Sequence, residues 1–162
     1  MLLLLLLRPQ QLLMAERRVL FVCVENSGRS LMAEAMFNAN PPEGWIADSA
    51  GTSPAASANP RTGRMLRELG LDLPAHAPQP LTPEMMDRAS VRVTMGCLDD
   101  ASCPARLKTM ELRDWALPNP AGLDDDAFRH LRDRLAGLVR GLRTELILAD
   151  RRAAALDERH PR

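Results

Sequence analysis

Cys23 and Arg29 stand at the two ends of a short loop, and Ser30 follows the arginine directly. A cysteine thiolate is a strong nucleophile, and an arginine offers two parallel N–H donors to two oxygens of a tetrahedral anion. The backbone N–H groups of such a loop, backed by a helix N-terminus, bind an oxyanion and favour the thiolate. The spacing therefore predicts nucleophilic attack on a bound oxyanion. The residues expected to contact that anion are Val24, Glu25, Asn26, Ser27, Gly28, Arg29 and Ser30.

The alternative is a buried thiol at a strand end and an unrelated surface arginine. The flanking segments favour the catalytic interpretation. The apolar, β-branched run Val19–Val22 is typical of a buried parallel strand. After the loop, apolar residues recur at helical spacing from Leu31 to Met36, and Ser30 is placed to cap that helix.

The rest of the chain alternates strands with helices. The predicted segments are strands at 45–52, 91–95 and, more weakly, 109–113, and helices beginning at 59–60, 82–83 and 123. This order predicts an α/β fold, a four-stranded parallel sheet with helices on both faces. Ligands of such sheets bind beyond the carboxyl ends of the strands, where Cys23 and Cys97 both stand.

The length of 162 residues suits one domain, expected at 17–150. Before it, the apolar run Leu2–Leu7 is too short for a secretory segment and no basic residue precedes it. Residues 1–16 are therefore interpreted as a mobile leader, or as an over-long gene start, and the protein as cytoplasmic. Residues 151–162 are charged and Ala-rich, and we expect this tail to fray.

The amino-acid composition narrows the classes of function that this chain could have. Basic and acidic residues balance at 21 each, so charge favours neither nucleic acid nor a membrane as partner. Three cysteines do not suit a disulfide framework, and neither they nor the histidines show metal-ligand spacing. The thiols are better explained by catalysis or redox chemistry.

Cys97 and Cys103 form a second feature, because a loop of this length can close a disulfide if it folds back on itself. The alternative is two unrelated thiols. With Cys23 expected at the same rim of the sheet, three thiols could act in series.

The loop from Cys23 to Ser30 resembles the phosphate-binding loop of low-molecular-weight protein tyrosine phosphatases and thioredoxin-coupled arsenate reductases. The Cys97 and Cys103-Pro104 segment resembles the redox segment of the reductases, which ordinary phosphatases of this superfamily lack. The likeness runs from Val19 to Leu146. It also includes Ser49–Gly51, His76, Trp115 and Pro118–Gly122.

This resemblance implies the low-molecular-weight phosphatase fold and reduction of arsenate to arsenite, for arsenic detoxification. Cys23 would attack arsenate, Cys97 would then attack the Cys23 sulfur as arsenite leaves, and Cys103 would take over the disulfide. Thioredoxin would reduce that last disulfide as an external partner. No tightly bound cofactor is implied, although some of these reductases bind potassium near the loop, and Asn26, Glu34 and Ser49 fit that pattern.

The sequence departs from both families at Asn119, where each ordinarily has an aspartate as general acid. An asparagine can donate a hydrogen bond but cannot give up a proton. This argues against a phosphatase and leaves arsenate reduction open. Nearby acids, Asp114 and Asp124–Asp126, could substitute, although a solvated acidic run beside a helix start is the simpler interpretation.

Two smaller departures lie in the loop itself. Gly28 replaces a cysteine found in many relatives, and Glu25 stands where glycine is common. A carboxylate at Glu25 should weaken anion binding unless it points outward or meets a cation.

Two other functions remain. A phosphatase would need Cys23 and Arg29 but not the other two cysteines. A non-catalytic protein would bind an oxyanion or arsenite, or sense oxidants with its thiols. The sequence does not decide whether thioredoxin or a small thiol is the reductant, nor the oligomeric state.

Overall fold

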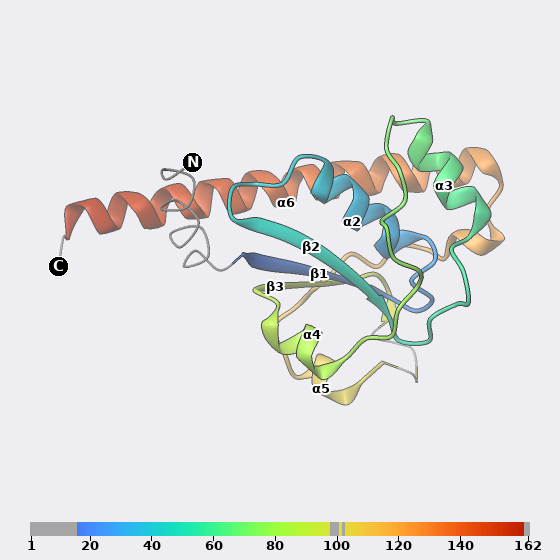
Figure 1. Cartoon of the computed structure of the whole chain (residues 1–162), viewed down its shortest axis with the longest axis horizontal. Coiled ribbons are helices and arrows are strands. Elements are labelled where there is room, and N and C mark those ends of the chain that lie inside the picture. The colour runs from blue at the N-terminus through green and yellow to red at the C-terminus, as the bar shows by residue number, and fades with distance from the viewer. Residues whose placement is uncertain (1–15, 98–100, 102, 161–162) are drawn as a thin grey trace, which may run out of the picture.

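The computed structural model describes residues 16–97, 101 and 103–160 (Figure 1). The leader expected at 1–16 lies outside these residues except for Glu16. The described residues form a single sheet and five α-helices, in the order β1, α2, β2, α3, α4, β3, α5, β4, α6, with a short 3-10 turn, η2, before α6.

The sheet has four parallel strands in the order β2-β1-β3-β4, as predicted. Their bounds are β1 Arg17–Cys23, β2 Trp45–Gly51, β3 Val91–Thr94 and β4 Arg113–Asp114. The prediction of a fourth strand at 109–113 was largely wrong, because β4 has only two residues. An unpredicted helix, α5 (Ala105–Lys108), precedes it, and Thr109 and Met110 close turns onto that helix.

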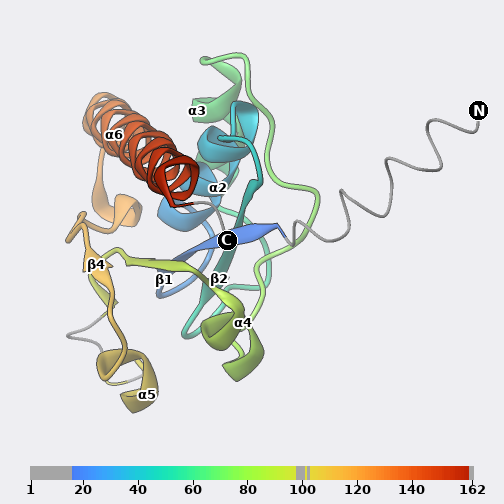
Figure 2. The same ribbon diagram turned by 90° about the vertical axis from the view of Figure 1, so that its left-hand side faces the viewer.

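Helices cover both faces of the sheet (Figure 2). On one face lie α2 (Arg29–Ala39), α3 (Pro60–Arg67) and α6 (Asp125–Arg159), over the larger core. On the other lie α4 (Pro83–Arg88) and α5, over a smaller core that contains Cys97 and Cys103. The layered α/β arrangement expected from the sequence is confirmed.

Side-chain caps fix three of the helix starts. Asn59 accepts a hydrogen bond from Arg61 N, Thr82 from Met85 N, and Asp124 from Ala127 N. The helix starts near 59, 82 and 123 were therefore predicted correctly. Ser30 was wrongly predicted as a cap, because α2 begins at Arg29 and Gly28 is its N-cap residue without a side-chain bond.

The C-terminal half of α6 is linked to the start of β1 through Asp150. Arg17 donates to both carboxylate oxygens of Asp150, at 2.6 and 2.7 Å, and Trp45 Nε1 donates to the same carboxylate at 3.0 Å. Beyond this contact α6 continues as helix to Arg159, whereas the sequence had suggested fraying after Asp150. Within the described residues, no helix is both long enough and apolar enough to cross a membrane.

Candidate active site

The loop between β1 and α2 surrounds a small pocket beyond the carboxyl end of the sheet. The pocket is small and opens to solvent. Its lining residues are Cys23, Glu25, Ser27, Gly28, Arg29, Asn59, Asn119, Pro120 and Ala121. The structure therefore brings Cys23, Arg29 and Asn119 together, as expected, although Asn119 is far from the loop in sequence.

Cys23 lines this pocket, and the residue is only 2% exposed. Asn26 N donates to it at 3.3 Å, and the Ser30 hydroxyl lies 2.9 Å away. Asn26 Nδ2 donates to the Ser30 oxygen at 2.7 Å, which leaves the hydroxyl hydrogen of Ser30 to donate to the sulfur. Two hydrogen-bond donors and the N-terminus of α2 therefore surround the sulfur that would attack a bound anion.

Three backbone positions allow the loop and its neighbouring segments to pack so closely. Asn26 adopts the left-handed conformation, with φ of 49°, which asparagine tolerates better than most residues. At Gly51, at the end of β2, a Cβ would lie 2.7 Å from Val24 O. At Gly28 a Cβ would lie 3.0 Å from the Pro120 ring, so the absence of a side chain lets the 120–122 turn approach the loop.

Arg29 is buried and connects the loop to two other segments. Its Nη1 donates to Met95 O at 2.6 Å and to Leu117 O at 2.9 Å. Both bonds use one terminal nitrogen, so Nε and Nη2 can present a fork to an anion in the pocket that Arg29 lines. Arg29 thus holds the loops before Cys97 and Asn119 in place while facing the substrate position.

Cys97 and Cys103 lie in contact, with their sulfurs 3.4 Å apart and both side chains buried. Burial raises the pKa of the Cys97 thiol, and the neighbouring Cys103, Asp114 and Cys23 raise it further. Gly96, with φ of +87°, turns the chain between β3 and this pair. The two cysteines singled out in the sequence therefore lie side by side, close enough for a disulfide to form between them with a small movement.

Asn119 begins the short turn η2 (Pro120–Gly122), where its side-chain oxygen accepts from Ala121 N at 3.0 Å. Its amide hydrogens remain to donate toward the pocket. The nearby acids suggested as substitutes are used elsewhere: Asp114 accepts from Gly96 N and Ala116 N, and Asp124 caps α6.

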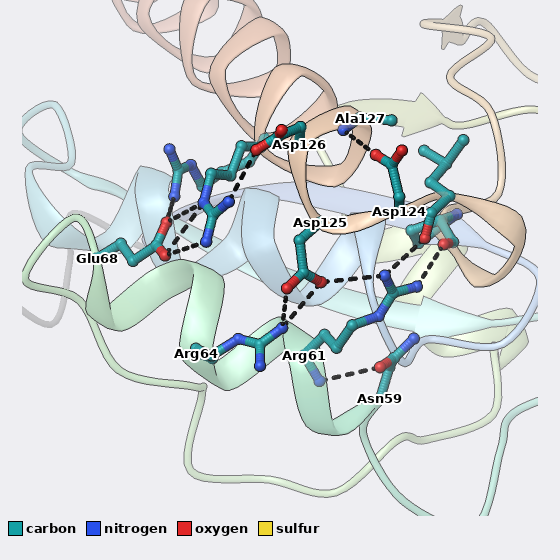
Figure 3. Close-up of polar contacts among 12 residues, drawn as sticks. Asn59, Arg61, Arg64, Glu68, Asp124, Asp125, Asp126 and Ala127 are labelled. Atoms are coloured by element: carbon teal, nitrogen blue, oxygen red, sulfur yellow. Dashed lines mark hydrogen bonds and ion pairs between the residues drawn. The ribbon is translucent and has the colours of Figure 1, made fainter.

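Asp125 and Asp126 are also paired with arginines (Figure 3). Asp125 accepts from Arg64 at 2.9 Å and from Arg61, which also holds the carbonyls of Pro120 and Leu123. Asp126 pairs with Arg129 on the exposed side of α6. These contacts support the interpretation of the acidic run as a solvated helix start.

Glu25 is exposed, yet it also lines the pocket. Its carboxylate accepts from the Ser27 hydroxyl at 3.3 Å rather than from a cation. The backbone carbonyl of Glu25 is fixed by a bond from Ala55 N at 2.9 Å. The carboxylate is thus at the mouth of the pocket, in reach of a bound anion.

The three residues suggested for potassium lie together but do not fit a cation. Asn26 turns its amide hydrogens toward Ser49 Oγ, at 2.9 Å, and its oxygen accepts from Gln79 N. Both carboxylate oxygens of Glu34 face His76 Nε2, at 2.9 and 3.0 Å. Since hydrogen-bond donors already occupy these oxygens, no step is assigned to potassium. Among the described residues, no cluster of His, Cys, Asp or Glu suits a metal ion either.

The Glu34–His76 pair should make the stability of the protein depend on pH. Burial raises the pKa of Glu34. For His76, burial alone would lower the pKa, but the bonds to Ala77 O and Glu34 outweigh it and raise the pKa above 6.5. Stability from a raised pKa is complete below the unfolded value and is lost as the pH rises through the folded value. The free energy of unfolding should therefore fall between pH 6 and 8.

Urea unfolding at pH 6 and at pH 8 measures this change. The free energy of unfolding should fall less between the two pH values for His76→Gln than for the wild type. His130→Gln, on the exposed side of α6, is the matched control and should keep the wild-type difference. Equal falls in the wild type and His76→Gln would contradict the assignment.

Several residues around the pocket were not predicted. Asn59, Pro120 and Ala121 line it, and Gln79 holds Asn26 through its backbone N–H and Ser49 through its side chain, at 2.8 Å from Ser49 O. Asn59 was identified only as a helix cap. The signal for Gln79 was weak because its main contact is made by a backbone group, which any residue except proline could supply.

Comparisons of the sequence and of the structure with known proteins agree on one family. The profile of the low molecular weight phosphotyrosine protein phosphatase family matches residues 18–152. Arsenate reductase 1 of Staphylococcus epidermidis is 28% identical over 126 residues, which are 78% of this chain and 95% of that protein.

Solved structures agree with this result. A thioredoxin-dependent arsenate reductase of Corynebacterium glutamicum superposes with a TM-score of 0.68 at 29% identity, over 88% of this chain and 71% of that one. A variant of the YwlE arginine phosphatase with a phosphorylated active-site serine has a TM-score of 0.67 at 27% identity, over 80% of this chain and 95% of that one.

Proposed function

Because the chain belongs to the low molecular weight phosphotyrosine protein phosphatase family, we propose that it reduces arsenate to arsenite with three cysteines acting in series. The observation that carries the proposal is the contact between the Cys97 and Cys103 sulfurs, 3.4 Å apart. Cys97 follows β3, which runs parallel to β1, the strand that ends at Cys23. A phosphatase has no use for this pair. Relatives named arsenate reductases support the same reaction.

In the first step, the Cys23 thiolate attacks arsenic and a hydroxyl oxygen leaves. Loop N–H groups, the Arg29 fork and the Asn119 amide hold the remaining oxygens. In the second step, the Cys97 sulfur attacks Cys23 Sγ, the S–As bond breaks, and its electron pair reduces As(V) to arsenite. A Cys23–Cys97 disulfide is left.

In the third step, Cys103 attacks Cys97, restores the Cys23 thiolate and closes a Cys97–Cys103 disulfide. Thioredoxin then supplies two electrons by thiol–disulfide exchange. Cys97 must lose its proton before it can attack, and the raised pKa of its thiol holds it inactive in the resting protein. The negative charge of the Cys23 thiolate contributes to the raised pKa of Cys97. The Cys23 sulfur loses this charge when the adduct forms.

A second function, phosphatase activity, is favoured by the similarity to the arginine phosphatase. It would use Cys23 and Arg29 and would be independent of the other two cysteines.

The test is arsenate-dependent consumption of NADPH in the presence of thioredoxin and thioredoxin reductase. The wild type should turn over steadily, and Cys23→Ser should show only the background rate because the nucleophile is missing. A wild type that binds arsenate without consuming NADPH would reject the reductase and favour the binding or sensing function.

A further inference from the structure

Glu25 is the carboxylate that lines the pocket, among the residues the structure describes. We propose that it is the general acid of this site and protonates the oxygen that leaves when Cys23 attacks. The proposal deepens the proposed function, since it rests on the same nucleophile. Glu25 would thereby supply the general acid that is absent at Asn119.

The first support comes from the other acids near the pocket. Asp114 accepts from two backbone N–H groups and from the Thr94 hydroxyl, at 3.0 to 3.2 Å. Asp124 caps α6, and Asp125 is held by two arginines. Each of these carboxylates is engaged by hydrogen-bond donors, and none of them lines the pocket around Cys23.

The second support is the position of Glu25. The left-handed turn at Asn26 lies between Glu25 and Ser27, and the Ser27 hydroxyl reaches Oε2 of Glu25 at 3.3 Å. The carboxyl is thereby held at the mouth, with Oε1 free of that bond. No basic residue is paired with it among the described contacts. The Glu25 carboxyl is therefore not engaged by a cation when an anion enters the pocket.

The step balances as follows. The Cys23 thiolate gives an electron pair to the central atom of the anion, and the bond from that atom to the leaving oxygen breaks. The leaving oxygen keeps the pair and takes the proton of the Glu25 carboxyl, departing as water from arsenate or as an alcohol from an ester. Glu25 is left as a carboxylate and regains a proton from water. Nothing is oxidised or reduced in this step.

The test compares two substrates that differ in their need for an acid. Phenyl phosphate releases a poor leaving group, whereas p-nitrophenyl phosphate releases a more acidic phenol that leaves with little help. Glu25→Gln keeps the size of the side chain and its ability to bond Ser27 but has no proton to give. It should lower kcat for phenyl phosphate about 100-fold, and for p-nitrophenyl phosphate by less than about tenfold.

Asp126→Asn is the control, because it removes an exposed carboxylate that pairs with Arg129. It should leave both rates unchanged. Equal losses on the two esters would show that Glu25 acts through charge or loop structure, and unchanged rates would show no role; either result overturns the proposal. A wild type that cleaves neither ester overturns it as well.

Failure of the arsenate reductase function would be distinguishable from failure of this proposal. In that case the wild type would consume no NADPH with arsenate, while the difference between the two esters would still depend on Glu25.

Discussion

A Cys103→Ser protein should release about one arsenite per molecule and then stop. Cys23 and Cys97 can still complete the first turnover, but the disulfide between them has no third thiol to move it. Both cysteines are buried, with residue exposures of 2% and 0%, so thioredoxin has little access to that bond. Rapid-quench measurement of arsenite against protein concentration, with NADPH consumption followed in parallel, checks this.

Cys97→Ser is the matched variant, and it should release no arsenite because no sulfur can attack the adduct. A small dithiol at high concentration should restart Cys103→Ser, since it is small enough to reach the buried disulfide. Steady turnover of Cys103→Ser with thioredoxin alone would contradict the order of the relay.

Arg29→Lys should lower kcat/KM for arsenate by about 1,000-fold. A lysine keeps the charge but loses the planar fork that grips two oxygens. Loss of one preorganised donor to a developing oxyanion typically costs on the order of 100- to 1,000-fold. Here the two carbonyls that position the neighbouring loops lose their partner as well. Arg64→Lys, a half-exposed arginine paired with Asp125, is the control and should stay near the wild-type rate.

Arg29→Lys should also destabilise the fold. Met95 O and Leu117 O would be left without the buried guanidinium, and an unpaired buried acceptor costs about 1–3 kcal/mol. Urea unfolding should therefore show a lower midpoint for Arg29→Lys than for Arg64→Lys. An Arg29→Lys protein with wild-type kinetics would show that the arginine serves only as a structural link.

The loop around Cys23 was predictable because all its chemistry is local. The strand, the thiol, the arginine and the helix follow one another within a few residues, and the spacing alone places them at one site. The parallel sheet was predictable for a similar reason, since Val19–Val22 and Val91–Val93 carry strong apolar patterns.

What the sequence did not reveal depends on distant partners. The carbonyls that hold Arg29 lie 66 and 88 positions away, and backbone oxygens leave no signature in the sequence. Ser30 looks like a cap by its position, but Cys23 and Asn26 take up its hydroxyl instead. The fourth strand was misplaced because β4 is exposed and only two residues long, too short for an alternating pattern.

The contact between Cys97 and Cys103 has a consequence for the choice of reductant. Two thiols held 3.4 Å apart have a very high effective concentration toward each other. In the proposed relay, a monothiol that opens the Cys97–Cys103 disulfide forms a mixed disulfide, which the adjacent freed thiol expels at once. A dithiol escapes this reversal, because its own second sulfur completes the exchange within the same encounter. In the proposed relay, the packing of this one side-chain pair would therefore favour dithiol over monothiol electron donors.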